Sequence, residues 1–136
     1  MNFKKLLGTS VCLSLISAVA LAAPPPLTTV TTNSDGQKMV ADSMGKTLYV
    51  FDPDMNQPTP TCTGDCAEVW PPYLLTPDEA NAVKNPLGKV ERANKKMQLT
   101  YGGRPVYTYA LDRAQGNDAG DGLEGTWHII KVTTHY

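Results

Sequence analysis

The chain has 136 residues, of which 41% are hydrophobic and 18% charged, and its formal net charge is −1. This length and composition exclude a multidomain protein and a disordered polyelectrolyte, so we expect one small domain. Twelve basic residues against thirteen acidic ones leave no surplus of positive charge to neutralise a phosphate backbone, which makes nucleic acid a poor partner.

The first residues have the pattern of a secretory signal peptide. Lys4 and Lys5 precede an apolar run over residues 6–21, and the run ends in the small-x-small sequence Ala20-Leu21-Ala22. The run is dotted with polar residues and is shorter than the ~20 apolar residues of a membrane span. We therefore predict cleavage after Ala22 and no transmembrane segment in the mature chain. Removal of the two lysines lowers the net charge from −1 to −3.

Cys12 lies within this run, preceded by Thr9-Ser10-Val11. It lacks the leucine and the small residue that usually precede the modified cysteine of a bacterial lipoprotein. We therefore expect no lipid anchor and a soluble protein in the periplasm or outside the cell. The mature chain keeps two cysteines, Cys62 and Cys66, an even number suited to an oxidising compartment.

The chain beyond the leader contains an internal duplication. A shift of 58 residues aligns, without a gap, Lys38-Met39, Gly45, Tyr49 and Asp54 with Lys96-Met97, Gly103, Tyr107 and Asp112. Two units are too few for a solenoid or propeller. We expect a single domain, residues 23–136, made of two repeats at about 30–72 and 88–132 that pack on each other about a pseudo-twofold axis.

Strands and tight turns dominate the predicted secondary structure. A first strand is expected over residues 27–32. Residues 38–41 and 46–51, joined by a turn at 42–45, predict a hairpin, and residues 97–101 and 104–109, joined by Gly102-Gly103, predict its counterpart. A final strand is expected over residues 125–132.

One short helix is predicted between the repeats, over residues 76–82. Thr76 is placed as its N-cap, Pro77 occupies the first helical position, and Glu79 is spaced for a capping box. Pro86 limits this helix to about two turns.

Alternation along the second strand of each hairpin predicts the fold class. Tyr49 and Phe51 lie on one face of their strand and Leu48 and Val50 on the other, and the second copy repeats the arrangement. Because both faces are largely apolar, we expect the strands to be covered on both sides. The prediction is a mainly β fold, a small sandwich or barrel-like domain of two pseudo-symmetric, hairpin-containing repeats.

Three segments together carry a family resemblance. They are residues 47–54, the cysteine pair followed by Trp70-Pro71-Pro72, and Gly125-Thr126-Trp127-His128. They resemble the bacterial "secreted repeat of unknown function", predicted lipoproteins marked by a Tyr-x-(Phe/Trp/Tyr)-x-x-Asp motif. The motif stands here twice, at Tyr49, Phe51 and Asp54 and at Tyr107, Tyr109 and Asp112. The resemblance implies export and two repeats and brings no activity, while the missing lipobox departs from the lipoprotein pattern.

The cysteines Cys62 and Cys66 leave three interpretations open. A disulfide is the first, since Gly64 supplies a turn and closing so short a loop would stabilise by roughly 2 kcal/mol. The second is a copper site, in which both thiolates, His128 and Met55 would form a soft ligand set. The third is a redox-active pair, although three residues separate the cysteines where the common redox motif has two.

The repeated motif residues also have two interpretations each. Asp54 and Asp112 could form an acid/base pair brought together by the symmetry, but each follows a strand and is better placed to cap a turn. The aromatic motif residues could form a stacking platform for flat ligands, but their alternation within apolar strands favours the core.

The remaining candidates are weaker. Residues 112–124 are rich in glycine and acidic residues, yet they do not fit the helix-loop-helix calcium template, so a solvated loop is expected. His128 lies on a predicted strand and is expected to be an ordinary packed or surface residue. The chain has no serine-hydrolase elbow, phosphate-binding glycine loop or paired-histidine zinc motif.

These observations lead to two functional hypotheses. The first is an exported, non-enzymatic β domain without a cofactor, which binds an envelope or extracellular partner. The alternative is a periplasmic copper-binding or thiol-redox protein that uses Cys62 and Cys66.

Overall fold

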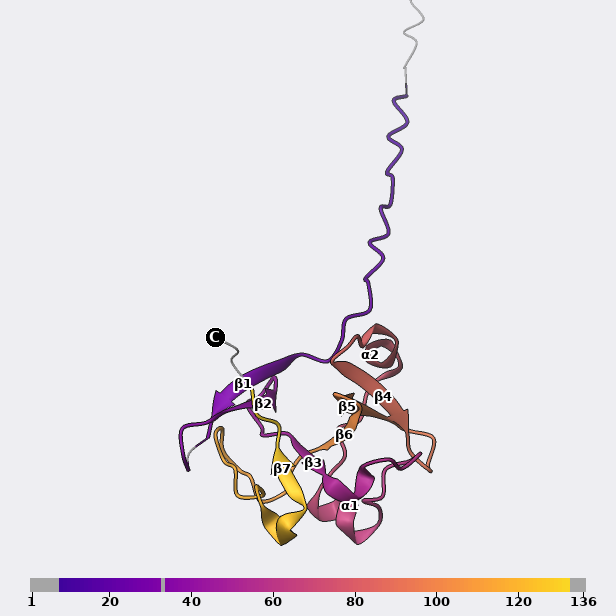
Figure 1. The fold of residues 1–136 in the computed structure, drawn as a ribbon. Helices are drawn as coiled ribbons and strands as arrows, with labels where there is room; N and C mark the ends of the chain where they lie inside the picture. Colours follow the sequence, from indigo (N-terminus) through magenta and orange to yellow (C-terminus); the bar gives the residue numbers. More distant parts are fainter. Residues whose placement is uncertain (1–7, 33, 133–136) are drawn as a thin grey trace, which may run out of the picture.

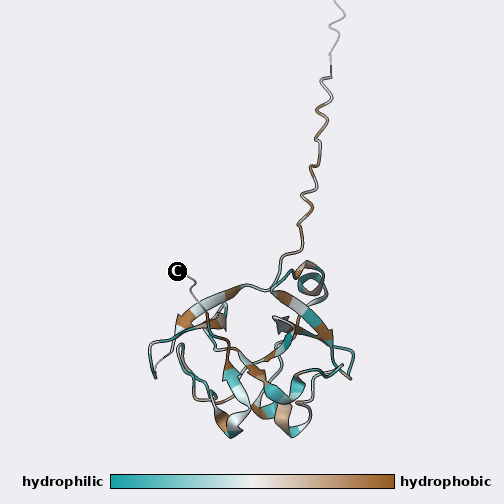
Figure 2. Cartoon of the chain, viewed as in Figure 1, coloured by the Kyte–Doolittle hydropathy of each residue, from teal (hydrophilic) through white to brown (hydrophobic). Residues whose placement is uncertain are grey.

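The computed structural model describes residues 8–32 and 34–132. Residues 8–24 are exposed throughout and run away from the domain as an extended, largely hydrophobic segment (Figures 1 and 2). Among the described residues Pro25 is the first that is buried, and strand β1 (Leu27–Thr31) begins two residues later. The folded domain therefore starts just beyond Ala22. Within the described ranges, no helix is long and apolar enough to cross a membrane.

The mainly β fold is confirmed, with two sheets in the described part of the chain. In the smaller sheet, β1 pairs antiparallel with β2 (Lys38–Asp42). The larger sheet has the order β4-β5-β6-β3-β7, formed by β3 (Tyr49–Phe51), β4 (Leu87–Glu91), β5 (Met97–Tyr101), β6 (Arg104–Tyr107) and β7 (Trp127–Ile129). The two sheets do not close into a barrel.

Short helical segments connect the strands. The predicted helix forms as α2 (Pro77–Ala82), where the Thr76 side chain accepts from the Glu79 amide and the Glu79 carboxylate accepts from the Thr76 amide, completing the capping box. Helix α1 (Asp65–Val69) was not predicted; it begins after Gly64, whose φ of 57° suits a residue without a side chain. Two 3-10 turns, η1 (Asp52–Asp54) and η2 (Leu123–Gly125), follow β3 and precede β7.

The two repeats are related by a pseudo-twofold axis through the larger sheet. Tyr49 of β3 lies directly opposite Tyr107 of β6 in the antiparallel ladder. These residues are 58 positions apart, the period of the duplication. Equivalent residues can face each other across an antiparallel pair only if a twofold axis passes between them, so the symmetry expected from the sequence is present.

Each repeat also gives its last extended segment to the other repeat. Strand β7 of the second repeat pairs with β3 of the first, with Trp127 opposite Phe51. In return, Pro72 of the first repeat and Leu74 just after it form bridges to β6 and β5 of the second, opposite Tyr107 and Gln98. The repeats are therefore interlocked, and neither has a complete sheet by itself.

This exchange explains two strands that are shorter than predicted. The turn after β2 forms as expected, with Ala41 bridged to Thr47, but the chain then leaves β2 and residues 49–51 join the larger sheet. At the carboxyl end, β7 covers only Trp127–Ile129, because Gly125 belongs to η2 and Lys131 forms a bridge to Met39 of β2. In both places the segment divides its pairing between the two sheets.

Two apolar clusters lie on opposite faces of the central strands, as the alternation predicts. The first contains most of the aromatic residues and comprises Val30, Met39, Ala41, Tyr49, Cys62, Trp70, Tyr107, Tyr109, Trp127 and Ile129. The second is largely aliphatic and comprises Val40, Leu48, Val50, Leu75, Ala80, Leu99, Val106 and Ile130. The aromatic residues of the repeated motif therefore share one cluster.

Candidate functional site

The repeated motif forms a reciprocal pair of hydrogen bonds between the repeats. The hydroxyl of Tyr49 donates to the carboxylate of Asp112 at 2.5 Å, and the hydroxyl of Tyr107 donates to that of Asp54 at 2.6 Å. Both tyrosines are fully buried, and both aspartates are 5% exposed. The tyrosine of each motif copy thus binds the aspartate of the other copy.

The second oxygen of each aspartate caps a loop seven residues further along the chain. Oδ1 of Asp54 accepts from the amide and hydroxyl of Thr61, and Oδ1 of Asp112 accepts from the amide of Ala119. These carboxylates bind tyrosine hydroxyls and loop amides and do not form an acid/base pair with each other. The turn-capping interpretation is the one that their contacts support.

Burial shifts the protonation equilibria of these groups. Removal from water raises the pKa of both Tyr49 and Tyr107 well above the usual tyrosine range, and the neighbouring carboxylates add to the shift. Burial also raises the pKa of Asp112, against the lowering effect of the Tyr49 hydrogen bond. At neutral pH the tyrosines are therefore fixed in the neutral, donating form.

Four aromatic rings beside these hydrogen bonds stack on one another in a single column, which we call the aromatic stack. Phe51 stacks on Trp127 with ring centroids 4.1 Å apart, Trp127 stacks on Trp70 at 3.8 Å with an interplanar angle of 3°, and Trp70 stacks on Tyr109 at 4.3 Å. The stack is pseudo-symmetric, with the two tryptophans at its centre. Tyr49 and Tyr107 contact these tryptophans edge-on. Trp70, Tyr109 and Trp127 are buried and Phe51 is part-buried, so the stack packs mainly as core.

Cys62 and Cys66 are joined in a disulfide whose Cα atoms are 5.3 Å apart. Cys62 is buried against the aromatic cluster, and its carbonyl oxygen accepts from the guanidinium of Arg92, itself buried. In the disulfide neither sulfur is a thiolate, so the copper site considered from the sequence lacks two of its four ligands. Of the other two, Met55 is exposed and His128 binds a carboxylate.

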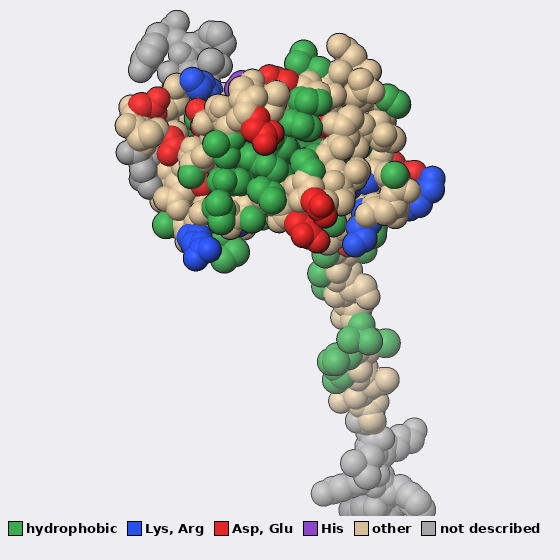
Figure 3. All heavy atoms as spheres, turned by 90° about the horizontal axis from the view of Figure 1, so that it is seen from below, with side chains coloured by type: hydrophobic (Ala, Val, Ile, Leu, Met, Phe, Trp, Pro, Cys, Tyr) green, Lys and Arg blue, Asp and Glu red, His purple; other side chains and the backbone are tan. Residues whose placement is uncertain are grey.

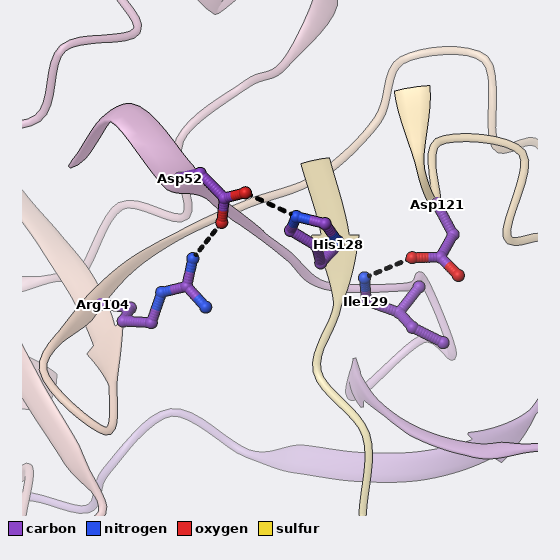
Figure 4. A network of polar contacts seen from close by, with 5 residues as sticks. All are labelled: Asp52, Arg104, Asp121, His128 and Ile129. Atoms are coloured by element: carbon purple, nitrogen blue, oxygen red, sulfur yellow. Dashed lines mark hydrogen bonds and ion pairs between the residues drawn. The ribbon is translucent and has the colours of Figure 1, made fainter. Parts of the chain in front are cut away.

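That carboxylate belongs to Asp52, which lies between His128 and Arg104 (Figure 4). One oxygen of Asp52 is 2.9 Å from the Arg104 guanidinium and the other is 2.7 Å from Nε2 of His128. The His128 hydrogen bond, helped by Arg104, lowers the pKa of Asp52 below its usual range. From the sequence, His128 was expected to be an ordinary packed or surface residue without a particular partner. The structure places it in a half-exposed polar network with Asp52 and Arg104.

Several side-chain oxygen atoms of the acidic loop over residues 112–124 accept hydrogen bonds from backbone amides. The Asn117 side chain accepts from the amides of Arg113 and Ala114, and the Asp121 carboxylate accepts from the amide of Ile129 (Figure 4). Among the described residues, no group of three or more histidine, cysteine, aspartate or glutamate side chains could hold a metal ion. The solvated, turn-rich loop expected from the sequence is what its contacts support.

An exposed apolar surface lies at the end of the domain that carries α1 and η2. Figure 3 shows hydrophobic side chains gathered on this face, with acidic side chains around them. Val69 of α1 is 46% exposed, Leu111 is 58% exposed and Leu123 of η2 is 36% exposed. The amide of Ala110 donates to the carbonyl of Val69, which fixes the loop containing Leu111 beside α1. We call these three residues, together with Asp65 and Glu68 of α1, Glu124 of η2 and Asp121 beside it, the lower face.

Comparison with known families agrees with this internal symmetry. A family model described as a secreted repeat of unknown function matches the chain twice, over residues 29–73 and 88–131. The chain belongs to this family. Each match spans one of the two structural repeats, which confirms the resemblance and the two copies. A search of curated proteins and a search of solved structures found no match.

The family motif therefore lies in the core, and the exposed candidate surface is outside it. Sequence reasoning did not identify the lower face. The clearest signal in the sequence was Leu123, a single apolar residue within a run of glycine and acidic residues. One residue of this kind is ordinary on a protein surface, and only the fold places the Leu111 loop beside α1, at the end of the domain that also carries η2.

Proposed function

We propose that this protein is an exported, non-catalytic binding module that contacts an envelope or extracellular partner through its lower face. The observation that carries the proposal is the exposed apolar surface formed by Val69, Leu111 and Leu123. Both repeats contribute to it, and contiguous exposed apolar surface on a small soluble domain is typical of an interaction site.

The interior of the domain supports a binding role over a catalytic one. The polar motif groups, the hydroxyls of Tyr49 and Tyr107 and the carboxylates of Asp54 and Asp112, are buried and bonded to one another or to loop groups. A catalytic group must reach a substrate, and these groups are used to hold the two repeats together. The family motif then serves folding, and function belongs to the surface.

The amino-terminal segment supports export. Residues 8–24 are exposed throughout, and Pro25 is the first residue of the described range that is buried. Residues 8–22, the described part of the leader, are therefore not buried against the folded domain. The hydrophobic leader, the missing lipobox before Cys12 and the disulfide all agree with a soluble protein in the periplasm or outside the cell.

Site-specific photo-crosslinking tests the proposed surface. A benzophenone amino acid is placed at Leu111 or Leu123 and, as a matched control, at Thr29 or Asn81, which are exposed on β1 and α2 away from the lower face (Figure 1). The chains are exported from living cells and irradiated, and the adducts are compared by mass.

The proposal predicts a discrete adduct from positions 111 and 123 that is missing from positions 29 and 81. The adduct from position 111 should also disappear in a chain that carries Val69→Ser, provided that this chain melts like the parent. Equal yields from the two sets of positions, or no adduct from the lower face, would contradict the proposal.

A further inference from the structure

The lower face carries a strong excess of negative charge. Asp65 and Glu68 lie in α1, and Asp121 and Glu124 lie in or beside η2, while neither segment contains a basic residue. All four are exposed. Within the described part of the chain, none of the four forms an ion pair. Figure 3 shows the lysine and arginine side chains of this view at the margins of the domain.

Asp52 provides an internal comparison. Its carboxylate is held between Arg104 and His128, so part of its charge is neutralised within the protein. The four acidic residues of the lower face have no cationic partner among the described side chains, and of these four carboxylates Asp121 accepts from the backbone amide of Ile129. Their field is therefore directed to solvent and to whatever docks on this face.

The two segments that carry this charge correspond to each other in the two repeats, although their acidic residues do not align. Helix α1 and turn η2 begin at Asp65 and Leu123, which are 58 positions apart, and each leads directly to one tryptophan of the aromatic stack. Acidic side chains therefore come from both repeats, with the apolar residues of the lower face among them. A complementary ligand needs an apolar strip with positive charge along its borders.

We infer that the partner of the lower face is a basic amphipathic segment of another polypeptide, with an apolar strip bordered by lysine or arginine side chains. This inference rests on the proposed function and specifies its partner class. The apolar side chains of such a segment would cover Val69, Leu111 and Leu123, and its cations would meet the acidic border. An anionic membrane surface carries charge of the same sign as the lower face and as the mature chain, so repulsion disfavours it.

The experiment uses the mature chain, residues 23–136, and two fluorescent helical peptides. One peptide has a leucine face and a lysine face, and its twin has glutamate in place of each lysine. Binding is followed by fluorescence anisotropy at low and at high salt. Vesicles containing phosphatidylglycerol are tested in parallel as an anionic membrane probe.

Two double variants separate the lower-face charge from net charge. Glu68→Gln with Glu124→Gln removes two charges from the lower face, where neither residue makes a hydrogen bond to another described side chain. Asp78→Asn with Glu91→Gln removes two charges from α2 and β4 and serves as the matched control. Urea melts establish that both double variants fold like the parent.

The inference predicts saturable binding of the lysine peptide that weakens as salt rises, and at least about tenfold weaker binding of its glutamate twin. The lower-face variant should weaken binding of the lysine peptide severalfold, and the control variant should leave it unchanged. Binding of the vesicles should be absent.

Other results would overturn the inference, and they would show separately whether the proposed function still holds. If both peptides bind equally and Leu111→Ser weakens both, the lower face binds partners but does not select positive charge. If neither peptide binds while the lower-face crosslinks form, the partner has another chemistry. Equal loss in the two double variants, or binding of the anionic vesicles, would also overturn it.

Discussion

Removal of the tyrosine hydroxyls tests whether the repeated motif stabilises the fold, and the structure predicts that the two copies respond unequally. Tyr49→Phe leaves the buried Asp112 with one described donor, the amide of Ala119, and deprives the amide of Gly120 of its acceptor. A lost bond to a buried carboxylate costs about 1.5–3 kcal/mol, and the orphaned amide adds to this. We expect Tyr49→Phe to lower the free energy of unfolding by about 2–3 kcal/mol.

Tyr107→Phe is the matched control in the other repeat. Here Asp54 keeps two donors, the amide and the hydroxyl of Thr61, so the buried charge remains partly compensated. We expect a smaller loss, about 1–2 kcal/mol. With a urea slope of about 1–2 kcal/mol/M for a domain of this size, the two variants should have clearly separate midpoints in urea melts.

The pH dependence provides an independent signature. The Tyr49 hydrogen bond lowers the pKa of Asp112 against the raising effect of burial, so its removal raises that pKa further. A carboxyl group whose pKa is higher in the folded than in the unfolded protein destabilises the fold while it is ionised. Protonation at lower pH removes this cost. The difference between parent and Tyr49→Phe should therefore shrink from about pH 7 to about pH 4.5. Equal costs for the two variants, or losses below about 0.5 kcal/mol, would refute the structural role of the motif.

Three further predictions follow from the core. Denatured but unreduced mature protein should contain no titratable thiol, and replacing Cys62 and Cys66 by alanine should cost roughly 2 kcal/mol in a urea melt; two free thiols would contradict the bridge. Because burial raises the pKa of Tyr49 and Tyr107, their contribution to stability is fully present below about pH 10 and is lost at higher pH, so their phenolate absorbance should appear only with unfolding. Reversible ionisation of all tyrosines would contradict this. Gly120→Ala would place a Cβ 2.6 Å from a ring atom of the aromatic stack and should lower the free energy of unfolding by about 1–3 kcal/mol. A melting curve like that of the parent would contradict this, because it would show that the stacked rings move aside at little cost.

Local patterns in the sequence predicted the elements that local chemistry determines. The α2 helix follows from Thr76, Pro77 and Glu79, whose spacing alone defines the capping box. The two faces of β3 follow from alternation, since Tyr49 and Val50 enter opposite clusters. The 58-residue period predicted the pseudo-twofold axis, because duplicated sequences adopt equivalent structures.

Other features depend on distant residues and could not be predicted. Nothing near Tyr49 indicates that its partner is the aspartate of the other repeat, 63 positions along the chain. The exchange of β7 and residues 72–75 between repeats is likewise long-range pairing. Helix α1 was missed because it is short and starts at a glycine, and β4 was missed because its residues alternate little in hydropathy.

The candidate site shows the same division between local and distant information. The sequence directed attention to the cysteines and to the motif residues, which the structure places in the core, apart from the part-buried Phe51 and Cys66. The lower face takes Val69, Leu111 and Leu123 from three segments of the chain, and the hydrogen bond from Ala110 to Val69, between the two repeats, places the Leu111 loop beside α1.

The central claim is that this protein binds through its lower face while the family motif maintains the fold. Hydrogen–deuterium exchange of the mature chain, measured with and without the lysine peptide, tests it most directly. The account predicts new protection in α1, in the loop around Leu111 and in η2, with no change in β1 or β4. Protection confined to β1, β4 and the groove between Leu27, Leu87 and Tyr101 would contradict it, because binding would then occur on another part of the domain.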